Sequence, residues 1–91
     1  MAIKMTWALI GEHMDEWTGD SYREAVTVLT ERIGAAVSAS GMSPQTQAHF
    51  RETFLAPLRA GVPLEGRAAV NAGRQWNKAA GPLLVALAPM S

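Results

Sequence analysis

Cysteine is absent from this sequence of 91 residues, and the chain carries no formal net charge. Without cysteine there can be no disulfide, no thiolate metal site and no Cys-His catalytic pair. No apolar run approaches the roughly 20 residues that a membrane-spanning helix needs. The N-terminus also lacks the short apolar stretch behind a basic region that marks a signal peptide. We therefore expect a cytoplasmic protein without a membrane span.

The sequence also lacks the short motifs that carry common catalytic chemistry. It has no glycine-rich phosphate loop and no Gly-x-Ser-x-Gly nucleophile turn. Its two histidines, His13 and His49, have acidic neighbours, but a di-iron site in a helical bundle needs more converging carboxylates. We therefore expect no catalysis, no metal and no cofactor.

The clearest element that is present is a helix between Asp20 and Gly41. Ser21 and Glu24 have the spacing of a capping box, and Gly41 suits the left-handed end of a helix. Between these ends, apolar residues recur every three or four positions, at Tyr22, Val26, Leu29, Ile33 and Ala36 or Val37. A helix of this length depends on the elements that cover such a stripe.

Residues 1–17 have apolar side chains at heptad-like spacing, at Ile3, Trp7, Ile10, Met14 and Trp17. This spacing predicts a first helix, which the turn at 18–20 would join to the central helix in an antiparallel hairpin. Ser43 and Pro44 have the residue types of a helix start and predict a third helix, from Pro44 to about Leu58, which Pro57 should kink or end near Ala56. Gly61-Val62-Pro63 is expected to form a second break.

A fourth helix is expected from Pro63 to Gly81, with a thin apolar line at Leu64, Ala68, Ala72, Trp76 and Ala79. Residues 82–91 form an apolar tail, which either completes the core as a short final helix or binds another molecule. The sequence thus predicts a single all-α domain over residues 1–91. Its fold would be a small bundle of four helical segments, with an N-terminal helical hairpin, two shorter C-terminal helices and the tail.

Charge is distributed unevenly along the chain. Residues 1–48 contain three basic and six acidic residues, whereas residues 49–91 contain five basic and two acidic residues. Either the two halves neutralise each other within one molecule or between copies, as in a head-to-tail assembly or a homodimer, or the basic half binds an acidic partner or phosphates.

Our first functional interpretation is a helical protein-protein interaction module that acts by occupying a surface, as an adaptor, an assembly subunit or an inhibitor. Tryptophan and arginine are enriched at interface hot spots, and methionine suits adaptable apolar surfaces. The interface candidates lie in the basic half and the tail: Arg67, Arg74, Lys78, Leu83, Leu84 and Leu87.

An alternative interpretation is a DNA-binding regulator, because residues 33–54 resemble a helix-turn-helix. A helix end rich in small residues is followed by a turn at Gly41 and by Ser43-Pro44, which opens a second helix. The resemblance implies that the second helix reads the major groove. Its groove-facing candidates are Gln45, Thr46, Gln47, His49 and Arg51. The zero net charge counts against this interpretation, because small DNA-binding domains are usually basic.

A third interpretation comes from Trp17-Thr18-Gly19, between two segments that are expected to be helical. These residues resemble the Trp-x-Gly turn of the WXG100 family, whose members are small helical hairpins exported by type VII secretion. The resemblance implies a secreted helical hairpin.

Overall fold

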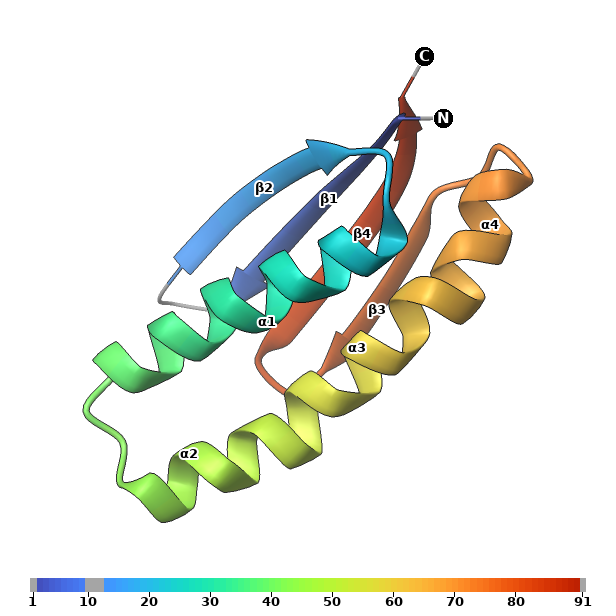
Figure 1. Cartoon of the computed structure of the whole chain (residues 1–91). Helices are drawn as coiled ribbons and strands as arrows, with labels where there is room; N and C mark the ends of the chain where they lie inside the picture. The colour runs from blue at the N-terminus through green and yellow to red at the C-terminus, as the bar shows by residue number, and fades with distance from the viewer. Residues whose placement is uncertain (1, 10–12, 91) are drawn as a thin grey trace.

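In the computed structural model, four strands form one antiparallel sheet and the helices cover one of its faces (Figure 1). The structure describes residues 2–9 and 13–90, with His13 described by its backbone alone. Two strands precede the helices and two follow them, and the order of strands across the sheet is β2-β1-β4-β3. The fold is therefore α+β, and the prediction of an all-α bundle is wrong.

The first hairpin occupies the segment that was predicted to be the first helix. β1 (Ala2–Leu9) pairs with β2 (His13–Gly19). In β1, every second side chain is buried: Ile3, Met5, Trp7 and Leu9. Burial of every second side chain is typical of a strand with one face on the core. This alternation, rather than the heptad-like spacing, determines the structure of the segment. Ile10, which belonged to that spacing, lies outside the described residues.

The Trp-x-Gly sequence lies at the end of β2 rather than between two helices. Trp17 pairs with Met5 of β1, and Gly19 pairs with Ile3. A helix follows this sequence, but a strand precedes it, so the helical hairpin that the WXG100 resemblance implies is absent.

The second hairpin joins β3 (Trp76–Ala80) to β4 (Leu83–Met90), with Gly81 in the turn at a φ of +56°. β4 pairs with β1 over its whole length, from Leu83 opposite Leu9 to Met90 opposite Ala2. The predicted fourth helix is therefore wrong for residues 72–81, and the predicted final helix is wrong for residues 82–90. The apolar tail does complete the core, but as a central strand.

α1 (Tyr22–Ala39) confirms the predicted central helix. The Ser21 Oγ accepts a hydrogen bond of 3.2 Å from the Glu24 backbone N-H, and Gly41 follows the helix with a φ of +80°. The side chains that this helix buries against the sheet are Ala25, Leu29, Ile33 and Val37.

The second helical segment runs without a break through residues 44–71, although two interruptions were expected. It comprises α2 (Pro44–Phe50), the wider π-helical turn η1 (Arg51–Leu55), α3 (Ala56–Gly61), the π-helical turn η2 (Val62–Gly66) and α4 (Arg67–Asn71). In η1 the Ala56 N-H donates to the Arg51 carbonyl, and in η2 the Arg67 N-H donates to the Val62 carbonyl, both five residues back. Such wide turns relieve the clash and the missing hydrogen bond of Pro57 and Pro63, so the helix continues.

Candidate interaction surface

Among the described residues, no helix or loop covers the second face of the sheet, which we call the uncovered face (Figure 1). Residues directly opposite each other on antiparallel strands point to the same face. The strand register therefore arranges the outward side chains in rows across the sheet. One row, which we call the apolar row, spans all four strands and consists of Met14, Ala8, Leu84 and Ala79.

Two side chains of the apolar row project far into solvent. Met14 is 74% exposed and Leu84 is 42% exposed, and Met90 at the other end of β4 is 40% exposed. A single exposed apolar residue is ordinary on a protein surface, whereas contiguous apolar patches of several hundred Å² mark interaction sites. The apolar row is therefore the strongest candidate for a binding site in the described structure.

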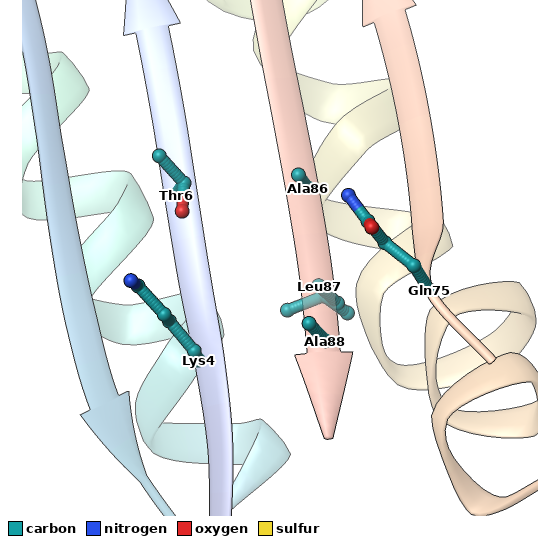
Figure 2. A pocket seen from close by; sticks show the side chains of 6 residues that line it. All are labelled: Lys4, Thr6, Gln75, Ala86, Leu87 and Ala88. Atoms are coloured by element: carbon teal, nitrogen blue, oxygen red, sulfur yellow. The ribbon is translucent and has the colours of Figure 1, made fainter. Parts of the chain in front are cut away.

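The outward side of β4 is apolar along its whole length, with Leu84, Ala86, Ala88 and Met90. A shallow trough of about 210 Å³ lies along this strand. Figure 2 shows its floor at Ala86 and Ala88, with Lys4 and Thr6 on one side and Gln75 on the other. Leu87 also lines the trough, although its side chain is buried among the core residues. The alanines allow another backbone or side chain to approach the sheet closely.

The charged side chains of the uncovered face neutralise each other. The Lys4 Nζ lies 3.0 Å from the Glu16 Oε2, which joins β1 to β2. Both side chains are about half exposed, at 46% and 60%, so this ion pair contributes less than about 1 kcal/mol to the free energy of unfolding. Its main effect is to leave the face without a net charge.

The two edge strands each carry an ionisable side chain that points toward the helices. Asp15 of β2 accepts a hydrogen bond of 2.8 Å from the Arg32 Nη1 of α1. Lys78 of β3 lies 3.6 Å from Glu65 of η2. An inward-pointing charge on an edge strand opposes the addition of another strand. A partner would thus meet less resistance on the uncovered face than at either edge.

The structure does not bring the predicted interface residues together. Leu83 and Leu87 are buried in the core, whereas Leu84 lies on the uncovered face. Lys78 is engaged on the helical side of the sheet, and the Arg67 guanidinium lies 5.8 Å from the centre of the Tyr22 ring. Arg74 is exposed in the connection before β3. Leu84 is thus the one predicted interface residue on the uncovered face.

The predicted DNA-reading residues lie at the start of the second helical segment: Gln45, Thr46, Gln47 and His49 in α2, and Arg51 at the start of η1. Four of their side chains make local hydrogen bonds. The Thr46 hydroxyl lies 2.9 Å from the Ser43 hydroxyl, and the His49 Nδ1 lies 3.5 Å from the Thr53 hydroxyl. The Gln47 amide donates to the Met42 carbonyl at 2.9 Å, and the Arg51 Nη2 donates to the Ser38 hydroxyl at 3.4 Å. The segment runs nearly antiparallel to α1 in Figure 1, whereas the helices of a helix-turn-helix cross steeply.

The apolar residues of the uncovered face that the sequence interpretation missed are Ala2, Ala8, Ala86, Ala88 and Met90, whereas Met14 and Ala79 were assigned to the apolar lines of helices. Their signal is alternation: in β1 and β4, outward residues alternate with larger apolar residues that are buried. Read with a period of two, this pattern identifies both the strands and their outward face.

Two further observations bear on function. No group of three or more potential metal-binding side chains comes together among residues 2–9 and 14–90. In the same part of the chain, no helix has the length and apolar character required to cross a bilayer.

Comparison with protein families, with curated proteins and with solved structures gave no match to this chain. The uncovered face therefore has to be interpreted from its own chemistry.

Proposed function

We propose that this protein is a non-enzymatic interaction module that binds a protein partner through the uncovered face of its sheet. The observation that carries the proposal is the apolar row, in which the exposed Met14 and Leu84 alternate with the alanines of the other two strands. Methionine side chains adapt to the shape of a partner, and the centres of interfaces are depleted in charge. An adaptor, an assembly subunit and an inhibitor would all act in this way, by occupying a surface.

The charges of the uncovered face favour a protein partner over DNA. DNA-binding surfaces present basic side chains to phosphates, but Lys4, the basic residue on this face, is paired with Glu16. A cytoplasmic location stays a prediction, which imaging of a tagged full-length chain would test.

The proposal can be tested by site-specific photo-crosslinking in cells that make the protein naturally. A photoreactive amino acid replaces Leu84 in one variant and Arg59 in a control. Arg59 is also exposed, but it lies on α3, on the helical side of the molecule. We expect discrete protein adducts from position 84 and none from position 59. Equal labelling from both positions, or no adduct from position 84, would contradict the proposal.

A further inference from the structure

We infer that the partner on the uncovered face is a second copy of the chain, related to the first by a two-fold axis that lies between β1 and β4 and runs parallel to them. This inference rests on the proposed function and specifies its partner. It comes from the sizes of the side chains that the strand register pairs.

On the uncovered face, each pair formed by β1 and β4 joins one alanine to one larger residue. The four pairs are Ala8 with Leu84, Thr6 with Ala86, Lys4 with Ala88 and Ala2 with Met90. The alanine lies on β1 in the two outer pairs and on β4 in the two inner pairs. The face is therefore a pattern of projections and hollows in which every projection has a hollow beside it.

The proposed axis exchanges the positions of β1 and β4 without changing the height along the strands. Leu84 of one copy would then face Ala8 of the other, and Met90 would face Ala2. By the same operation, Lys4 would face Ala88 and Thr6 would face Ala86. Each larger side chain enters a hollow of the other copy, as facing layers of a well-packed core require.

The outer strands fit the same operation. It exchanges β2 and β3, so Met14 of one copy would face Ala79 of the other, and Glu16 would face Asn77, whose amide can donate a hydrogen bond to a carboxylate. Lys4 keeps its ion pair with Glu16 inside each copy, so no unpaired charge enters the interface. Two sheets packed face to face are rotated relative to each other by about 30° because each is twisted. The facing side chains would therefore match best near the two-fold axis.

The size of the face agrees with a reversible dimer. The four strands have 8, 7, 5 and 8 residues, and at about 4.8 Å between strands and about 3.3 Å per residue they cover about 440 Å². Two copies would thus bury about 900 Å², which lies in the range of weak, transient interfaces. A two-fold interface uses the same surface on both copies and closes on itself, so a dimer forms rather than a fibre.

The test is analytical ultracentrifugation of the full chain together with variants that exchange a projection and a hollow. We expect the parent chain to show a monomer-dimer equilibrium with a dissociation constant in the micromolar range, as suits an interface of about this size. Ala8→Leu fills a hollow and Leu84→Ala removes the facing projection. Each single change should weaken dimerisation by about tenfold or more. The double variant exchanges the two and should restore dimerisation to within about threefold of the parent.

Circular dichroism would confirm that each variant is folded. If a change at position 8 prevents folding, Ala79→Met and Met14→Ala provide the same exchange on the outer strands. A parent chain that stays monomeric at several hundred micromolar, or a folded double variant that does not recover dimerisation, would overturn the inference.

The mass of the photo-crosslinked adduct at position 84 separates this inference from the proposed function. Twice the chain mass agrees with a dimer, and an adduct with another protein keeps the proposed function but rejects the second copy.

Discussion

The two faces of the sheet are built from the same strands, but on the central strand β4 they differ in side-chain size rather than in polarity. All residues of this strand are apolar. On the covered face it buries Leu83, Val85 and Leu87. On the uncovered face the centre of the strand has Ala86 and Ala88, with larger side chains only at its ends. Hydrophobicity alone therefore does not separate core from surface here, but residue volume together with strand alternation does.

Removing a leucine side chain from each face should give the largest difference in stability between them. Leu87 is fully buried, and Leu84 on the same strand is 42% exposed. We expect Leu87→Ala to lower the free energy of unfolding by about 2–5 kcal/mol, because it removes apolar contacts and leaves a cavity. Leu84→Ala should cost less than about 1 kcal/mol in the monomer, since part of that side chain is already in water.

Urea unfolding measures both costs, at a protein concentration low enough to keep the chain monomeric. Equal losses of stability from the two variants would mean that the uncovered face is part of the core of the single chain. The contrast between the faces, and the proposed binding surface with it, would then have to be abandoned.

On the covered face, the helices approach the sheet closely at Gly66. Gly66 lies in η2, and a Cβ atom there would stand 2.5 Å from the Leu87 Cδ1 and 3.1 Å from the Trp76 ring. Leu87 is fully buried and has little room to move. We expect Gly66→Ala to lower the free energy of unfolding by about 1–3 kcal/mol through overpacking, despite the better helix propensity of alanine.

Gly34→Ala is the matched control for this change. Gly34 lies in α1, and a Cβ atom there would meet no atom within 4 Å. The gain in helix propensity should then raise the stability by about 0.5–1 kcal/mol. Thermal or urea unfolding measures both changes in stability. If the two variants changed the stability in the same direction, the close approach of the helix to the sheet would not decide the effect of adding a Cβ atom.

The sequence was sufficient to predict α1, because the signals for this helix are local. Its capping residue, its apolar stripe and the glycine after its end all lie within the segment itself. Residues 2–9 also contain a local signal, the alternation of Ile3, Met5 and Trp7 with smaller or polar residues. The heptad-like spacing of other residues in the same segment concealed it, because a short apolar segment can satisfy both periods.

The long helix could not be predicted from local signals, because proline normally ends a helix. Its continuity depends on the wide turns η1 and η2 and on the packing of Gly61 and Gly66 against Trp76. That packing exists only once β3 has joined the sheet. Likewise, a helical interpretation made Leu83, Leu84 and Leu87 equivalent, whereas the strand separates Leu84 from the other two. The candidate site therefore could not be predicted without the strand register. That register depends on contacts between the two ends of the chain.

We expect the smallest change in stability at Tyr22, whose polar hydroxyl group is buried on the covered side of the sheet. Burial raises the pKa of the Tyr22 hydroxyl above its ordinary value of 10.0, and the positive charge of Arg67 opposes this rise. The hydroxyl oxygen has no hydrogen-bond partner among the described residues. Tyr22→Phe should therefore change the free energy of unfolding by less than about 1 kcal/mol at neutral pH, and the Arg67 contact with the ring can remain.

The two chains should differ at alkaline pH. Because the folded state holds the Tyr22 proton more tightly than the unfolded state, its contribution to stability is fully present below pH 10 and is lost as the pH rises through the higher pKa of the folded protein. Urea unfolding at pH 8 and above pH 10 should show a larger alkaline loss for the parent chain than for Tyr22→Phe. If both chains lost the same stability at alkaline pH, the Tyr22 hydroxyl would be exposed to water. The covered side would then be solvent-accessible at the start of α1, which would weaken the contrast between the two faces.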